Sequence, residues 1–201
     1  MDTSPPSADH DLLDRALAGD EAAFVTLVGL YHAPLLRFAR TFVRQPSQAE
    51  DVVQETWLAV LTGLERFERR ASFKTWLFRI LSNRARTKAV RESRFDQLDP
   101  AADGGGVSDD RFTAEGRWRT PPREWRLTPE RLLQSKEARA IVEAALETLP
   151  AGQRAVVTLR DVEGLEAAEV CNVLGITETN QRVLLHRGRA RIREALAEGL
   201  D

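Results

Sequence analysis

Residues 166–189 read EAAEVCNVLGITETNQRVLLHRGR, and they give the clearest indication of how the chain folds. Ala167, Val170 and Leu174 recur at helical spacing until Gly175, a residue type that often follows a helix end. Thr177 then supplies a hydroxyl of the kind that caps the start of a second helix. A helix, a glycine turn and a capped helix in this order predict a helix-turn-helix motif.

The second helix of this motif carries a basic outer stripe. Its members are spaced i, i+4, i+7 and i+11, and they are Arg182, His186, Arg189 and Arg193. The major groove of DNA admits one helix, and the flanking phosphates attract arginine, so the stripe indicates major-groove binding. The alternative is an ordinary helical hairpin with a solvated charged face. On the other side, Leu185, Ile192 and Leu196 are expected to face the core.

Two more helices are expected just before this motif. Apolar residues line one face from Ala138 to Leu149, where Pro150 stops the helix, and a short helix follows over residues 152–162. Upstream, Thr128 followed by Pro129 is typical of a helix start. The sequence therefore predicts a helical C-terminal domain over residues 128–201.

A separate helical domain is expected over residues 11–94. Phe24, Leu27 and Tyr31 begin a run of apolar residues at helical spacing. Ser47 and Glu50 fit a capping box, which predicts that the next helix starts near Gln48. A further helix should begin around Phe73 and continue through the basic residues 83–91. No alternating strand pattern occurs, so the fold class is all-α, with two small helical domains.

Residues 95–127 interrupt the helical pattern. They contain Pro100, three consecutive glycines at 104–106 and five aspartates, a composition that buries too little apolar surface to offset the entropy of chain ordering. We expect a flexible acidic linker there. Residues 1–10 are polar and acidic, and we expect a disordered tail.

The formal net charge of −2 conceals a strongly basic segment. Residues 66–94 hold ten Lys or Arg against Glu68 and Glu92, a net charge of +8. Aromatic residues lie among these charges, a combination that suits single-stranded nucleic acid, because rings stack on bases while cations hold the backbone. Taken singly, Phe73, Trp76 and Phe78 are better explained as core residues. Phe67, in the loop before the helix, is the exception.

Other classes of protein fit the sequence poorly. Cys171 is the sole cysteine, which we expect to be a small buried hydrophobe, and the three histidines lack metal-ligand spacing. No phosphate-binding lysine motif or zinc-protease motif occurs, so no metal, no cofactor and no catalytic residue is expected, and the chain should not be an enzyme. The start is not that of a secretory signal, and no apolar run approaches a membrane span, so a cytoplasmic location is expected.

Three motifs remain to be explained. They are residues 48–57 (QAEDVVQETW), residues 71–80 (ASFKTWLFRI) continuing to Asn83, and residues 149–154 (LPAGQR) leading to 174–177 (LGIT) and 186–189 (HRGR). The three motifs resemble those of extracytoplasmic-function (ECF) sigma factors, a group within the sigma-70 family of bacterial RNA polymerase, and they occur in the family's order and spacing.

The resemblance implies a role for each part of the chain. Residues 11–94 would be region two, which binds the β′ clamp helices of core polymerase and opens the −10 element. Residues 128–201 would be region four, which reads the −35 element next to the β flap. The linker would thread the RNA exit path. The expected function is promoter recognition, promoter melting and transcription initiation.

The resemblance also implies site residues. Those facing core polymerase are Asp51, Gln54, Glu55 and Leu58. Those at the −10 DNA are Phe67, Arg70, Lys74, Asn83, Arg84, Thr87 and Lys88, with Phe67 and Asn83 forming a pocket for one flipped base. Those at the −35 DNA are Thr179, Asn180, Arg182, Val183, His186, Arg187 and Arg189.

One departure from the family pattern concerns Gln181, which stands where many members have a buried valine. The resemblance therefore implies how this domain docks on DNA, whereas it does not imply which promoter sequence the domain recognises. The family also implies an anti-sigma partner, which can hold such a factor at the membrane, and association with the nucleoid as part of the holoenzyme. The alternative function is a stand-alone helix-turn-helix regulator with an N-terminal sensor domain.

Overall fold

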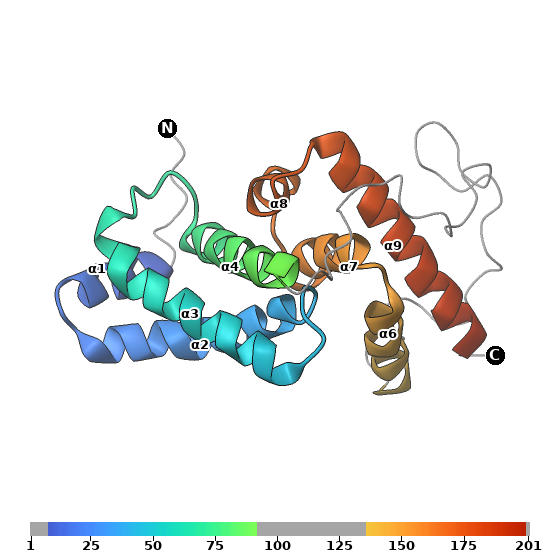
Figure 1. The fold of residues 1–201 in the computed structure, drawn as a ribbon, viewed down its shortest axis with the longest axis horizontal. Coiled ribbons are helices and arrows are strands. Elements are labelled where there is room, and N and C mark those ends of the chain that lie inside the picture. The colour runs from blue at the N-terminus through green and yellow to red at the C-terminus, as the bar shows by residue number, and fades with distance from the viewer. Residues whose placement is uncertain (1–7, 92–135, 200–201) are drawn as a thin grey trace. The chain divides into compact units, whose positions relative to one another are not determined.

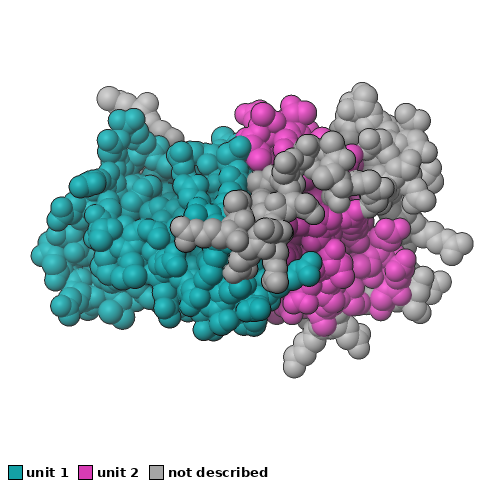
Figure 2. Space-filling view, viewed as in Figure 1, with its two compact units in different colours: residues 1–95, 168–175 teal, residues 96–167, 176–201 magenta. Residues whose placement is uncertain are grey.

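The structure is a computed structural model that describes residues 8–91 and 136–199. Within these two ranges the regular elements are all helical, which confirms the expected fold class (Figure 1). Contacts divide the chain into two compact units: residues 1–95 with 168–175, and residues 96–167 with 176–201 (Figure 2). The expected linker and the helix start at Thr128 lie outside the described residues.

The first unit contains four α-helices from the N-terminal part of the chain and a short 3-10 turn, η1. Their bounds are Ala8–Leu17 for α1, Glu21–Ala39 for α2, Pro46–Gly63 for α3, Leu64–Arg66 for η1 and Phe73–Arg91 for α4. Residues 8–10, which we expected in a disordered tail, are the start of α1. The helix α8, Ala167–Leu174, falls almost entirely within the same unit.

Helices α1 and α2 are joined by a tight turn with its own capping. Gly19 takes a positive φ of 92°, and Asp20 then caps α2 by accepting a hydrogen bond from the Ala23 amide at 3.1 Å. Farther along, the hydroxyl of Tyr31 donates to Asp9 at 2.5 Å. Burial and this hydrogen bond raise the pKa of Tyr31, so its phenol stays protonated. Helix α1 is thereby fixed to α2.

Helix α3 does not begin as expected. It starts at Pro46, with Gln45 as an N-cap that makes no side-chain cap hydrogen bond. Proline suits the first helical position because its fixed φ is helical and it needs no amide partner there. Ser47 and Glu50 therefore both lie inside the helix, and the capping box predicted at these residues is wrong.

The core of the first unit is aromatic and aliphatic. Phe38 and Phe78 are fully buried, with ring centroids 5.4 Å apart, and Phe24 meets Trp57 edge to face at 5.8 Å. Phe73 is also buried, whereas Trp76 is only half-buried. The assignment of Phe73 and Phe78 to the core is confirmed, and Trp76 lies at the edge of the core.

Helix α2 alone, among the described residues, is long and apolar enough to cross a membrane by length and composition. The expectation that no apolar run approaches the length of a membrane span was therefore too strong. One face of α2, from Ala23 through Leu27, Tyr31 and Leu35 to Phe38, is buried in the first unit, as in the core helix of a globular domain.

The second unit is built from α6 (Lys136–Thr148), α7 (Ala151–Val157), a π-helical turn (Thr158–Val162) and α9 (Glu178–Gly199). Pro150 separates α6 from α7, and the short helix expected over 152–162 corresponds to α7 with its π-helical extension. Gly164 follows with a φ of 71°. Helices α6 and α7 both pack against α9.

The turn before α9 follows the sequence expectation. Gly175 has a φ of 61°, and the Thr177 hydroxyl accepts a hydrogen bond from the Asn180 amide at 3.2 Å, so it caps α9. The buried positions of α9 are Gln181, Leu184, Gly188 and Ala190. Leu185, Ile192 and Leu196, which we expected to face the core, are half-buried, so the inward face was misplaced. Cys171 of α8 is likewise half-buried.

Candidate nucleic-acid interface

The candidate polymerase-binding residues lie on the outer side of α3. Val52, Val53 and Trp57 turn inward, and residues at the intervening positions therefore face solvent. The side chain of Leu58 is notable because a large apolar residue is 63% exposed there. All four candidates are exposed, and they are Asp51, Gln54, Glu55 and Leu58.

The two acidic residues among these candidates pair with basic side chains of α4. The Lys88 ammonium donates to Asp51 at 2.8 Å, and the Arg84 guanidinium lies 3.5 Å from the Glu55 carboxylate. Lys88 and Arg84 are candidate −10 residues, so the structure connects two groups that the sequence assigned to different partners. The pairing joins residues of neighbouring helices, and one sequence gives no signal for it.

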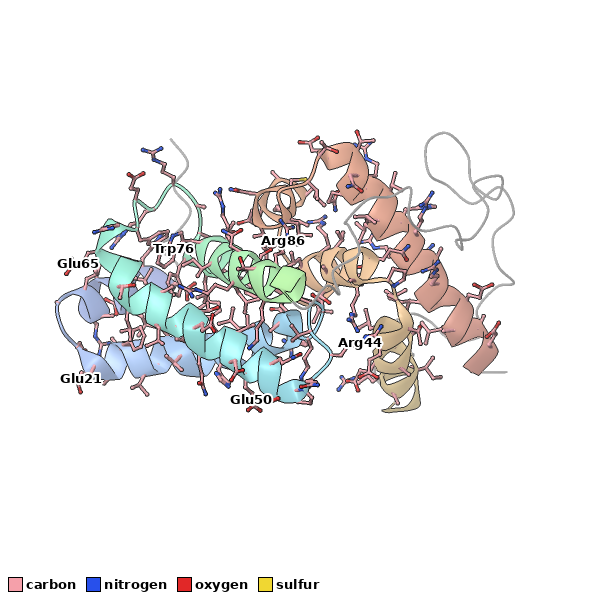
Figure 3. All side chains as sticks on the ribbon, in the orientation of Figure 1. Glu21, Arg44, Glu50, Glu65, Trp76 and Arg86 are labelled. Atoms are coloured by element: carbon pink, nitrogen blue, oxygen red, sulfur yellow. The ribbon has the colours of Figure 1, made fainter. Side chains whose placement is uncertain are left out.

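The loop between η1 and α4 carries Phe67. Its ring stacks at a tilt on Trp76, with centroids 4.8 Å apart, and meets the edge of Phe73 at 6.1 Å. Phe67 is half-buried, and Trp76 projects from the N-terminal part of α4 (Figure 3). The ring is thus supported on one side by the domain. It is suited to present a flat surface to a base.

Asn83 lies farther along α4, on the same helical face as Trp76, since the two are seven residues apart. That spacing corresponds to a rise of about 10 Å along the helix. Asn83 is exposed, as is Thr87, whose hydroxyl donates to the Asn83 carbonyl at 2.9 Å. The Trp76 ring, on which Phe67 stacks, and the Asn83 amide therefore share one face of α4.

Other candidate −10 residues follow Phe67 closely in the sequence. Arg70 pairs with Glu68 at 2.6 Å, and both side chains are well exposed. Lys74 is half-buried in the first turn of α4. Arg69, between Glu68 and Arg70, has a φ of 56° and pairs with Asp14 of α1. Nothing in the sequence marks Asp14 as a member of this site.

The candidate −35 residues lie in the N-terminal two-thirds of α9. Thr179, Arg182 and Arg189 are exposed. The half-buried candidates are Asn180, Val183, His186 and Arg187. Gln181 between them is 4% exposed, which confirms that the buried position of the family pattern carries an amide here.

Arg189 has an intramolecular partner. It donates through Nε and Nη2 to the two carboxylate oxygens of Asp161, at 2.9 and 2.5 Å. These hydrogen bonds raise the pKa of Arg189, and they fix α9 to the π-helical turn. Arg182 and Arg189 were expected on one basic stripe. They differ in that the Arg189 side chain is held by two hydrogen bonds to Asp161.

Comparison with known families covers both units. Residues 27–95 match the family described as Sigma-70 region 2, and residues 139–192 match the family described as Sigma-70, region 4. Together these matches span more than half of the chain.

Individual proteins are similar over nearly the whole chain. The ECF RNA polymerase sigma-E factor of Escherichia coli K12 is 30% identical over 185 residues, 92% of each chain. A probable RNA polymerase sigma factor of Haemophilus influenzae is 30% identical over 167 residues, 83% of this chain and 86% of that one.

Solved structures agree. CnrH, in complex with the cytosolic domain of CnrY, is 26% identical with a TM-score of 0.60, covering 96% of this chain and 99% of CnrH. RpoE of Bartonella quintana, in complex with the anti-sigma factor NepR, shares the fold at 22% identity and a TM-score of 0.57, over 87% of this chain and 96% of that one. The chain therefore belongs to the extracytoplasmic-function group of the sigma-70 family of RNA polymerase sigma factors.

Proposed function

We propose that this chain directs RNA polymerase to promoters, and that different helices bind core polymerase, the −10 element and the −35 element. Helices α3 and α4 bind core polymerase and open the −10 element, and α9 reads the −35 element. The observation that carries the proposal is the first unit's surface. An exposed acidic edge on α3 lies beside a basic face on α4, and the loop before α4 carries the supported aromatic ring of Phe67. The chain acts by binding and carries out no reaction of its own.

The direct test is transcription in vitro with purified bacterial core polymerase and a library of genomic fragments. Transcripts that start only when the full chain is added would support the proposal and would identify promoters for later experiments. Failure to direct any start would contradict it. The stand-alone regulator makes the opposite prediction, since it would bind duplex promoter DNA tightly without core polymerase. The family membership favours the sigma factor.

Within region two, Phe67 and Asn83 capture one flipped base of the −10 element. Unstacking a base costs a few kcal/mol, so a melting protein must offer stacking and edge contacts at the same place. Phe67 offers the ring, and the Asn83 amide both donates and accepts. Arg70, Lys74 and Thr87 hold the displaced strand beside them.

The pocket is tested by comparing closed-complex formation, by footprinting, with strand opening, by permanganate reactivity. Asn83→Ala should leave the footprint intact and reduce opening in a manner that depends on the flipped base. Equal opening for every base at that position would remove Asn83 from the pocket.

An anti-sigma factor is the remaining partner. The Bartonella RpoE was solved with the anti-sigma factor NepR, and CnrH was solved with the cytosolic domain of CnrY. The apolar Leu58 and Leu61 on α3 are 63% and 56% exposed. A partner that covers these side chains would also cover the polymerase-binding edge. Tethering of the factor at the membrane through that partner belongs to the same proposal.

The acidic linker, residues 95–127, completes the proposal by occupying the RNA exit path. Its negative charge suits a channel shaped for RNA. Deleting residues 104–110 should impair early RNA synthesis more than promoter binding. Normal synthesis with the deletion would make the segment a passive tether.

A further inference from the structure

The loop that carries Phe67 is anchored at two places. At its start, Phe67 rests against Trp76 and Phe73. Two residues later, the guanidinium of Arg69 pairs with the carboxylate of Asp14. The second anchor comes from α1, which lies 55 positions away in the sequence and before residue 27, where the match to region 2 begins.

Arg69 has an unusual backbone. Its φ of 56° lies in the left-handed region, and among the described residues no other non-glycine residue has a positive φ. A side chain with a Cβ is disfavoured there, so this conformation persists only when surrounding contacts hold it. The pair with Asp14 is a contact of that kind, because it fixes the guanidinium end of the same residue. Its side chains are 38% and 60% exposed, so the pair biases the loop toward this conformation only modestly.

Asp14 is well placed to act as a fixed point. Its neighbour Leu13 is fully buried, and Asp9, five residues earlier on α1, accepts the hydrogen bond from Tyr31. The hydrogen bond from Arg69 lowers the pKa of Asp14, so the carboxylate is charged at neutral pH. Helix α1 thus presents a charged side chain from a rigid base to a loop that lacks regular structure.

We propose that Asp14 and Arg69 are positioning residues for promoter opening, which hold the loop so that Phe67 is presented to the displaced −10 strand. The inference rests on the proposed capture of a base by Phe67. A loop already in its binding conformation loses little conformational entropy on capture, whereas a loose loop must be ordered in the same step. Removing the pair should therefore slow opening without affecting earlier steps.

The first experiment compares Asp14→Asn with Asp11→Asn in holoenzyme made from the full chain. Asp11 is the matched control, because it lies on α1 and its ion-pair distance of 3.8 Å is to Arg15 of the same helix. Permanganate reactivity at the promoter should fall about 5-fold for Asp14→Asn, as expected if the competent loop becomes a minor conformation. Asp11→Asn should match the wild type, and the closed-complex footprint should be unchanged in both.

A second set of variants separates the ion pair from the backbone. Arg69→Asn and Arg69→Gly both tolerate a positive φ but cannot pair with Asp14. If the pair positions the loop, both should show the opening defect of Asp14→Asn. The exchange Asp14→Arg with Arg69→Asp should restore part of the opening, since aspartate also tolerates this backbone and the charges again attract. Wild-type opening in Arg69→Gly, or no recovery in the exchange, would overturn the proposal.

Two further outcomes separate the positioning role of Asp14 from base capture by Phe67, on which it rests. Loss of closed complexes together with opening in Asp14→Asn would indicate a general structural role and would overturn the positioning role. Phe67→Ala tests the foundation separately: normal opening in that variant would refute base capture itself. A defect in Phe67→Ala with wild-type opening in Asp14→Asn would refute only the role of Asp14.

Discussion

Lys88 of α4 donates a hydrogen bond to Asp51 of α3 across 2.8 Å, so a proposed DNA contact and a proposed polymerase contact neutralise each other in the free chain. The Lys88 side chain is 23% exposed and that of Asp51 is 59% exposed. A pair this accessible contributes little to stability, which leaves both groups available to exchange partners.

Removing the charge of Asp51 should have two opposite effects. Asp51→Asn should weaken binding to core polymerase, because its clamp helices lose an acidic partner. It should also strengthen binding of the free chain to single-stranded DNA, because Lys88 is released, with the salt slope steepening by about 0.7 for one added phosphate contact. Both are measured by fluorescence anisotropy over a salt series. Glu50→Gln, an exposed carboxylate one residue earlier, is the control, and an equal rise there would reduce the effect to net charge.

Arg182 should govern promoter specificity more than general affinity. It is exposed on α9, and a bidentate arginine to guanine gives roughly 1–3 kcal/mol of discrimination. Arg182→Ala should therefore weaken binding to the chain's own promoter more than binding to unrelated DNA, in holoenzyme competition assays. Arg193→Ala, farther along the same stripe, should lower both alike. Equal losses for Arg182→Ala on all sequences would assign this residue to the phosphate backbone.

The buried Gln181 should be a point of weakness in the second unit. It is 4% exposed, and its Nε2 atom has no hydrogen-bond partner among the described residues. An unsatisfied buried donor costs about 1–3 kcal/mol, so Gln181→Leu, of similar volume, should raise the free energy of unfolding by about 1 kcal/mol. Urea unfolding, with hydrogen exchange of α7 and α9 amides, measures the change. A lower midpoint would show that the amide has a stabilising role.

Gly188 should be required for the close packing of α7 on α9. A Cβ at this position would lie 2.6 Å from Cγ2 of the buried Val157. Gly188→Ala should therefore destabilise the unit by about 1–3 kcal/mol, although alanine favours a helix more than glycine. Gly29→Ala is the matched control in α2, because nothing lies within 4 Å of its added Cβ. That variant should gain about 1 kcal/mol, and the same sign at both positions in thermal unfolding would contradict this explanation.

The sequence was sufficient for what depends on neighbours along the chain. The glycine turn at Gly175 and the cap at Thr177 follow from spacing within one or two helical turns, whereas the burial of Gln181 was expected from the family resemblance. The capping box at Ser47 failed because Pro46 itself starts the helix, and two local signals overlapped.

Relationships between distant residues could not be predicted in this way. Asp51 and Lys88 are 37 positions apart, and Asp14 and Arg69 are 55 apart. Their pairing depends on how the helices pack, and surface charges obey no periodicity that would reveal it. The positive φ of Arg69 is equally hidden, because arginine is not a residue type that indicates a left-handed backbone.

The contact between Phe67 and Trp76 gives the protein an intrinsic optical probe. Indole emission depends on the polarity and packing around the ring, and Trp76 is half-buried directly beneath the ring of Phe67. With Trp57, Trp118 and Trp125 replaced by phenylalanine, emission would arise from this one site. Stopped-flow fluorescence could then follow the loop during promoter melting in real time, without a label on the protein or on the DNA.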